Sequence, residues 1–162
     1  MKTEEIHQVL LAEIGEEAVL EAVLDVQQPF LRIAPESFLS VCQYLHSTET
    51  LWFDFLHAVS GVDPGKEADY LEAVYHLSSL IHEHQIVLKV RIPKEGTDSI
   101  PSVSGIWKAA DWHEREAYDL VGIRLSGHPD LRRILLPEDW NGHPLRKDYE
   151  TDESYHGIEI DY

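Results

Sequence analysis

Apolar residues recur at helical spacing in three stretches of the chain. Residues 3–14, 35–46 and 106–121 place apolar side chains three or four positions apart, which is typical of helices that cover a core with one face. Pro35 opens the second stretch and Gly122 follows the third, and both residues are common at those helix positions. The pattern therefore predicts three helices.

Apolar runs of strand length predict five strands. They span residues 18–26, 30–33, 51–59, 70–78 and 84–92. The last strand is the clearest, because every second residue from Ile86 to Ile92 is aliphatic and the positions between them are mostly polar. Short turns join the first two strands and also the last three, so we expect a hairpin and an antiparallel meander.

These elements predict an α+β domain over residues 1–122, with a mostly antiparallel sheet of about four to five strands and helices packed on it. Glycine and proline then interrupt residues 123–149 repeatedly, although this segment keeps many aliphatic side chains. We interpret residues 123–149 as an extended C-terminal arm that docks on a partner, with amides that exchange readily in the isolated chain. Residues 150–162 form an acidic tail.

The charge changes how the arm is interpreted. The chain carries a net charge of −17, which argues against nucleic acid and anionic lipid as main partners. Residues 105–149 hold seven basic and eight acidic side chains, so this block is nearly neutral between two acidic flanks. No apolar run approaches the roughly 20 residues that cross a bilayer, and the N-terminus lacks a secretory signal, so a cytoplasmic location is expected.

Metal-binding motifs are incomplete in this sequence. His82 and His84 are separated by one residue, as two ligands on a strand can be, but no third histidine or cysteine completes a set. His113 and Glu114 begin the His-Glu-x-x-His pattern of zinc proteases, but Ala117 stands where the second histidine belongs. An independent metal-dependent enzyme built on these residues is therefore a distant alternative.

Other catalytic signatures are missing from the sequence. It contains no glycine-rich phosphate loop, no Gly-x-Ser-x-Gly elbow and no Cys-x-x-Cys. The single Cys42 falls on an apolar helix face, so we expect a buried thiol and no cysteine-held cluster.

Basic and aromatic residues give the arm the composition of an interface. The guanidinium groups of Arg132, Arg133 and Arg146 are suited to binding carboxylates, and Trp140 and Tyr149 lie near them. The alternative is that these arginines pair with the chain's own excess of acidic residues. We favour contacts with another protein.

The arm and the helix before it resemble a known family. Glu114–Ile123 reads EREAYDLVGI, Gly127–Leu136 reads GHPDLRRILL, and Gly142–Tyr149 reads GHPLRKDY. These segments resemble the signature of the 30 kDa subunit family of NADH:quinone oxidoreductase, the respiratory complex I. The resemblance implies a non-catalytic structural and assembly subunit whose arm lies along the homologue of the "49 kDa" subunit, next to cluster-bearing subunits. It also implies that this chain binds no cofactor, since FMN and the iron–sulfur clusters belong to partner subunits.

The resemblance also implies roles for individual residues. Three would orient the helix and the root of the arm: Glu114, Arg115 and Glu116. Seven would contact partners: His128, Arg132, Arg133, Arg146, Lys147, Asp148 and Tyr149. Because the chain ends at Tyr162, we expect the 49 kDa partner to be a separate polypeptide, with the complex holding this subunit peripherally on the cytoplasmic side of the membrane. The equivalent subunit of a membrane-bound hydrogenase or a ferredoxin-linked complex is the closest alternative, because these complexes share the signature.

Overall fold

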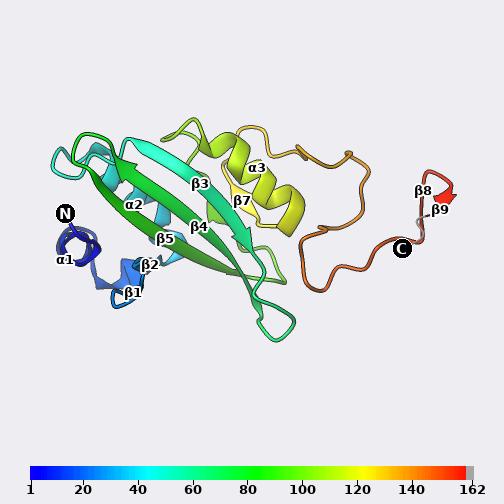
Figure 1. Cartoon of the computed structure of the whole chain (residues 1–162), viewed down its shortest axis with the longest axis horizontal. Helices are drawn as coiled ribbons and strands as arrows, with labels where there is room; N and C mark the ends of the chain where they lie inside the picture. Colours follow the sequence, from blue (N-terminus) through cyan, green and yellow to red (C-terminus); the bar gives the residue numbers. More distant parts are fainter. Residues whose placement is uncertain (160–162) are drawn as a thin grey trace.

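The computed structural model describes residues 1–159 and shows the expected α+β fold, a sheet with helices packed on it (Figure 1). The main elements are α1 (Thr3–Glu13), a 3₁₀ turn η1 (Glu16–Ala18), β1 (Val19–Val23), β2 (Phe30–Ile33), α2 (Pro35–Ser47), β3 (Phe55–Val62), β4 (Tyr70–Ser79), β5 (His84–Pro93) and α3 (Ala110–Val121). Two short pairs complete the set: β6 (Ile100–Pro101) with β7 (Leu125–Ser126), and β8 (Ser154–Tyr155) with β9 (Ile158–Glu159).

The five main strands lie in the order β1-β2-β5-β4-β3. The hairpin of β1 with β2 and the meander of β3, β4 and β5 are antiparallel, as predicted. The sheet is nevertheless mixed, because β2 and β5 pair in parallel. The helix α2 carries the chain from β2 across to β3, and the meander then returns β5 to the side of β2. The sequence pattern did not reveal this crossover.

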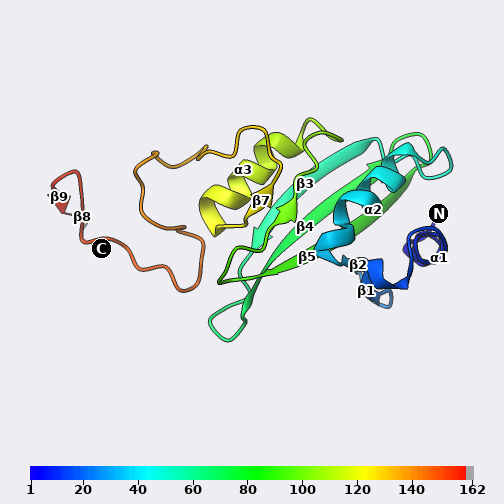
Figure 2. The ribbon, with the colours of Figure 1, turned by 180° about the vertical axis from the view of Figure 1, so that it is seen from behind.

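The core lies between the sheet and the helices on one of its faces, which Figure 2 shows from the helix side. The alternating residues Ile86 to Ile92 of β5 are buried there, as their spacing predicts. Cys42 is fully buried on α2, also as predicted, and burial raises the pKa of its thiol well above the ordinary value. On β3, Gly61 has no side chain, and this lets α3 approach the strand closely at Ala117 and Val121.

Several element boundaries differ from the sequence prediction, and three of them are informative. The strand β1 ends at Val23, and the helix expected from residue 106 begins at Ala110. The apolar side chain of Trp107 is buried ahead of that helix, and its indole donates to the backbone oxygen of Phe53 over 2.9 Å. Residues 51–54 form a loop before β3, although the side chains of Leu51 and Phe53 are buried as strand residues would be. In both places, apolar residues that are buried outside regular elements gave a sequence pattern like that of a helix or a strand.

The arm leaves the domain after α3 and runs alongside it before extending away from the sheet (Figure 1). No helix within residues 1–159 is both long and apolar enough to span a bilayer.

Candidate functional site

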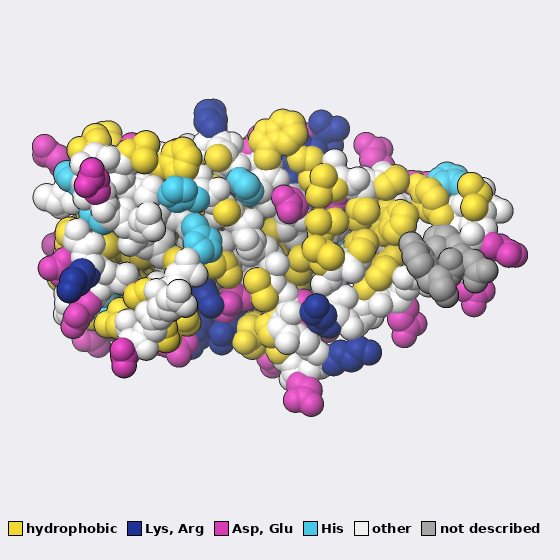
Figure 3. Space-filling view, viewed as in Figure 1, with side chains coloured by type: hydrophobic (Ala, Val, Ile, Leu, Met, Phe, Trp, Pro, Cys, Tyr) yellow, Lys and Arg dark blue, Asp and Glu magenta, His cyan; other side chains and the backbone are white. Residues whose placement is uncertain are grey.

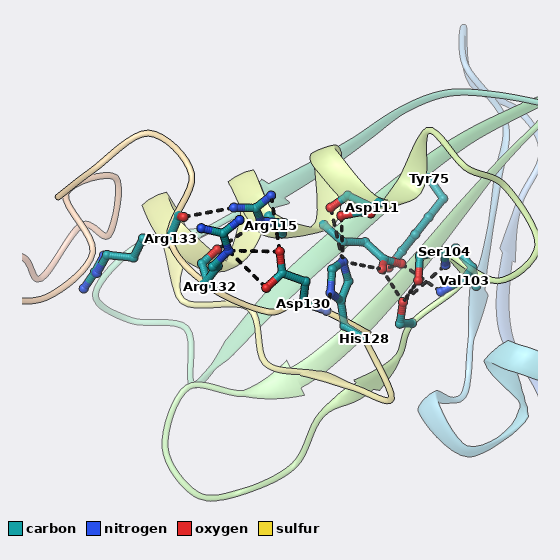
Figure 4. A network of polar contacts seen from close by, with 11 residues as sticks. Tyr75, Val103, Ser104, Asp111, Arg115, His128, Asp130, Arg132 and Arg133 are labelled. Atoms are coloured by element: carbon teal, nitrogen blue, oxygen red, sulfur yellow. Dashed lines mark hydrogen bonds and ion pairs between the residues drawn. The ribbon is translucent and has the colours of Figure 1, made fainter. Parts of the chain in front are cut away.

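The candidate site is the junction where residues 123–149, the arm, lie against α3. Its polar contacts run from Tyr75 and Val103 under the helix to Arg115 and Arg133 beside it (Figure 4). The helix contributes Glu114, Arg115 and Asp119 to this junction, and all three are buried. Burying a charged group destabilises the fold unless the group is paired, so the role of the junction follows from the partners of these three side chains.

Asp119 is fully buried and binds four donors of the arm. Its Oδ2 accepts the backbone N–H groups of Ile134, Leu135 and Leu136 over 3.0, 2.8 and 2.9 Å. Its Oδ1 accepts the guanidinium of Arg133 over 2.7 Å. One side chain therefore fixes three consecutive residues that belong to no helix or strand.

The pKa of Asp119 reflects this arrangement. Burial opposes ionisation of the carboxyl, but the N–H of Leu136, the guanidinium of Arg133 and the other two amides together outweigh it. The pKa of Asp119 therefore lies below its ordinary value, and the group is an anion when the arm is bound.

Two arginines complete the attachment of the arm. Arg133 also donates to the backbone oxygens of Trp140 and Gly142, each over 2.8 Å. Arg115 donates to the backbone oxygens of Arg132 and Arg133 over 3.2 and 3.1 Å. The guanidinium groups thus bind carbonyl oxygens that have no helix or strand partner, which holds the arm in one conformation.

Glu114 binds a different part of the chain. Its carboxylate accepts the hydroxyl of Ser102 over 2.5 Å and the backbone N–H of Val103 over 2.9 Å, and the hydroxyl of Tyr75 lies 3.5 Å away. Burial is the largest influence on this group, and it raises the pKa of Glu114 above the ordinary value despite these hydrogen bonds. Glu114 therefore secures the loop before α3 to the core.

The repeated Gly-His-Pro motif of the arm has a structural role. The Nδ1 of His128 accepts the N–H of Asp130 over 3.1 Å, so its Nε2 carries the proton that points to the backbone oxygen of Asp111, 3.2 Å away. His143 binds the backbone oxygen of Asp119 through its Nδ1 over 2.9 Å. The two histidines therefore attach the arm near the beginning and near the end of α3.

The last predicted contact residues lie on the outer part of the arm. Arg146 pairs with Asp148 over 2.8 Å, and the backbone N–H of Lys147 donates to Asp63 over 2.9 Å. Tyr149 is half-buried, and its ring lies close to Gly142, where an added Cβ would approach it to 2.9 Å.

The ten predicted site residues therefore divide into two groups. The buried or partly buried ones are bound within the chain, and they are Glu114, Arg115, His128, Arg133, Arg146 and Tyr149. The exposed ones are Glu116, Arg132, Lys147 and Asp148. For Arg132, Arg133 and Arg146, pairing with the chain's own acidic residues is what the structure shows, and their partners are Asp130, Asp119 and Asp148. Whether the exposed residues contact a partner stays a prediction.

Sequence reasoning missed Asp119, the residue on which the arm depends most. One signal was available, because an acidic side chain in the last turn of a helix is unfavourable next to the negative end of the helix dipole. An aspartate at that position indicates that other donors compensate.

The arm turns its polar backbone towards α3 and part of its apolar surface outwards. Leu135 and Leu145 are 62% and 56% exposed, and Trp112 on α3 is 65% exposed. In Figure 3, hydrophobic side chains gather over the part of the molecule where the arm lies. Exposed apolar groups held on a rigid backbone are typical of protein interfaces.

The histidines considered as metal ligands have other contacts. The Nε2 of His82 lies 2.8 Å from the backbone oxygen of Glu49, and the Nε2 of His84 lies 2.6 Å from that of Leu51. Within residues 1–159 no three histidine, cysteine, aspartate or glutamate side chains are placed to hold a metal ion together.

Comparisons with known proteins agree on one family. The model of the family described as "Respiratory-chain NADH dehydrogenase, 30 Kd subunit" matches residues 31–155. An NADH-quinone oxidoreductase subunit of Chloroherpeton thalassium is 48% identical over 128 residues, covering 78% of this chain and 52% of that protein. Its counterpart in Chlorobium phaeobacteroides is 45% identical over 136 residues, covering 83% of this chain and 81% of the relative. The counterpart in Salinispora arenicola is 44% identical over 147 residues, covering 90% and 58%.

The chain thus spans about half the length of the first of these relatives and most of the second. Among solved structures, a chain of the membrane-bound sulfane sulfur reductase, an archaeal respiratory membrane complex, has the same fold with a TM-score of 0.73. It is 22% identical, and the match covers 91% of this chain and 85% of that one.

Proposed function

The chain belongs to the 30 kDa subunit family of the respiratory-chain NADH dehydrogenase, and from that premise we propose that it is a non-catalytic structural and assembly subunit of a proton-translocating NADH:quinone oxidoreductase. In this role it supports electron transfer from NADH to quinone in the peripheral part of the complex without carrying electrons itself. FMN and the iron–sulfur clusters then lie in partner subunits. The single cysteine, buried in the core, supports this division, because cluster binding requires several thiolates.

The observation that carries the proposal is the attachment of the arm through Asp119. Four donors of the arm converge on this carboxylate, so the segment from Arg133 to Leu136 is held in shape before any partner binds. Preorganisation lowers the entropic cost of association. The exposed Leu135 and Leu145 then form a ready surface for the 49 kDa subunit, with the cluster-bearing subunits beside it.

In this role the chain is held peripherally on the cytoplasmic side of the membrane by the complex. The related hydrogenase-type or ferredoxin-linked complexes are the second candidate. Relatives at 40–48% identity are named as subunits of NADH-quinone oxidoreductase, whereas the sulfane sulfur reductase chain shares the fold at 22% identity. The closer relatives favour the NADH enzyme.

The proposal is tested by introducing charge on the outer face of the arm. The double variant Leu135→Asp/Leu145→Asp places two carboxylates where we expect an apolar contact, and neither side chain is part of the domain core. Leu20→Asp is the matched control, since Leu20 is 53% exposed on β1, far from the arm. We expect the double variant to lower the amount of complex on a native gel and its NADH:quinone activity together.

Both variants must unfold at the same urea concentration as the parent chain, so that a loss of assembly is not a loss of folding. Full assembly of the double variant would remove the arm from the interface.

Arginine variants refine the same test. Arg132 is exposed and pairs only with Asp130 among the described ion pairs, so Arg132→Glu probes the surface. Arg133→Glu breaks the contact with Asp119 and disturbs the arm from within. Weaker assembly from Arg132→Glu with unchanged stability indicates a direct partner contact.

A further inference from the structure

A second apolar surface lies at the end of the sheet opposite the arm. Three side chains form it, and we call them the Trp52 tip: Trp52 in the loop before β3, and Leu80 and Ile81 in the turn between β4 and β5. They are 40%, 64% and 69% exposed. Figure 1 shows the loop and the turn side by side, and Figure 3 shows hydrophobic side chains gathered at that end next to acidic ones.

The loop holds the indole of Trp52 outwards. The residues on either side, Leu51 and Phe53, are fully buried. The backbone oxygen of Leu51 accepts from His84 over 2.6 Å, and that of Phe53 accepts from Trp107 over 2.9 Å. Trp52 itself has a φ of +39°, which is rare for a bulky residue and persists only where neighbouring contacts enforce it. The conformation of the loop therefore keeps the indole exposed.

The turn presents aliphatic side chains where polar residues are usual. Turns of this kind favour glycine, asparagine, aspartate and serine, yet Leu80 and Ile81 stand at its most exposed positions. The backbone N–H of Leu80 donates to Asp54 over 2.9 Å, which ties the turn to the loop that carries Trp52. Nothing in the packing of the sheet requires these two aliphatic side chains.

The charge around the tip is predominantly negative, although the N-terminal ammonium of Met1 lies 3.4 Å from the Nδ1 of His84. The loop and turn segments, residues 45–57 and 79–84, contain no lysine or arginine but include the acidic residues Glu49, Asp54 and Glu83. Glu49 and Glu83 are exposed. The whole chain also carries a net charge of −17, so its long-range field adds to this local excess. Such a surface repels anionic lipid and attracts cationic side chains.

We propose that the Trp52 tip is a docking surface for a basic segment of another protein. That segment places an aliphatic side chain against Leu80 and Ile81 and a lysine or arginine over the exposed indole, within reach of Glu49 and Glu83. Cationic groups bind the faces of tryptophan rings, and rigid aromatic residues are frequent anchors of interfaces. The inference does not depend on the role of the arm, because the two surfaces lie at opposite ends of the sheet.

The test uses the full chain in its own cells, with the photoreactive residue p-benzoylphenylalanine at Ile81 and, in a second strain, at Leu80. The control strain carries it at Leu20, which is exposed on β1. After illumination, the crosslinked peptides are identified by mass spectrometry. We expect both tip positions to capture one segment of one other protein, with a lysine or arginine within a few residues of the crosslink.

Charge variants then decide whether the acidic residues take part. We expect Glu49→Lys/Glu83→Lys to lower the crosslinking yield at Ile81 at least fivefold, while Glu67→Lys in the distant turn between β3 and β4 leaves it unchanged. Thermal melting confirms that each variant is folded. The proposal is overturned by crosslinks no stronger than at Leu20, by capture of lipid or a second copy of this chain, or by a yield insensitive to charge.

Discussion

Replacing Asp119 with asparagine removes the charge that holds the arm while keeping the shape of the side chain. An amide has one acceptor oxygen and one NH2 donor. If its oxygen faces the N–H groups of Ile134, Leu135 and Leu136, its NH2 faces Arg133; in the other orientation the NH2 meets the three amides. Either way donors face donors in a buried site.

The magnitude follows from the pairing. Breaking a buried ion pair by removing one charge costs about 3–5 kcal/mol, because the remaining charge is left uncompensated. The four hydrogen bonds share one carboxylate and are not independent, so their separate values are not added. We expect Asp119→Asn to weaken the attachment of the arm by about 3–5 kcal/mol, which is roughly a factor of 10² to 4 × 10³ in its opening equilibrium.

Amide hydrogen exchange measures this directly in the isolated chain. The sequence pattern predicts weak protection throughout residues 123–149, but the structure changes that expectation for Ile134, Leu135 and Leu136, whose amides are bonded to a buried carboxylate. We expect these three amides to be protected in the parent chain and to exchange at least about 100-fold faster in Asp119→Asn.

Glu116→Gln is the matched control, since it makes the same chemical change at an exposed position of the same helix. Equal exchange at the three amides in the parent chain and Asp119→Asn would refute the reasoning.

Four further substitutions, one of them a control, test neighbouring contacts by urea unfolding. Because the pKa of Glu114 is raised in the folded protein, its contribution to the free energy of unfolding grows as the pH falls through that pKa. Glu114→Gln should abolish this pH-dependent contribution. It should also lower the free energy of unfolding by less than Asp119→Asn weakens the attachment of the arm. Gly122 has a φ of +81°, and an added Cβ would lie 2.7 Å from the ring of His143. Gly122→Ala should therefore lower the free energy of unfolding by about 1–3 kcal/mol. Gly127→Ala should lower it less, because the space around Gly127 is open. The pKa of Asp63 is lowered from 3.8 to about 2, so its contribution to the free energy of unfolding is present above its ordinary pKa and is lost as the pH falls from 3.8 towards 2. Asp63→Asn should remove this pH-dependent contribution.

Periodicity predicted those elements whose burial is regular along the chain. The alternate residues Ile86, Leu88, Val90 and Ile92 of β5 are buried, and α2 is buried on one helical face, so both were located correctly. Prediction failed where tertiary contacts bury apolar residues outside regular elements. Trp107 and Phe53 are buried in a turn and a loop that bind each other through the indole, and both were assigned to longer elements. The parallel pairing of β2 with β5 could not be predicted from the sequence pattern either, since it depends on the path that the chain takes through α2.

The sequence predicts an irregular, partner-docking segment after α3, and between residues 123 and 149 the structure forms only the short strand β7. Whether this segment docks on a partner stays a prediction. The sequence did not indicate that three consecutive amides of this segment turn towards Asp119, because such convergence depends on the position of the helix end. Nor did it distinguish Arg133, which is bound internally, from the exposed Arg132 next to it.

The most direct measurement of the proposed role is affinity purification of the tagged chain from its own cells, followed by assay of NADH oxidation by quinone in the eluate. The account predicts that the eluate contains a 49 kDa-type subunit and an FMN-binding subunit and that it oxidises NADH. It also predicts that the Leu135→Asp/Leu145→Asp chain elutes with less of both subunits. A chain that elutes alone, or within a complex that lacks the FMN subunit and does not oxidise NADH, would contradict it.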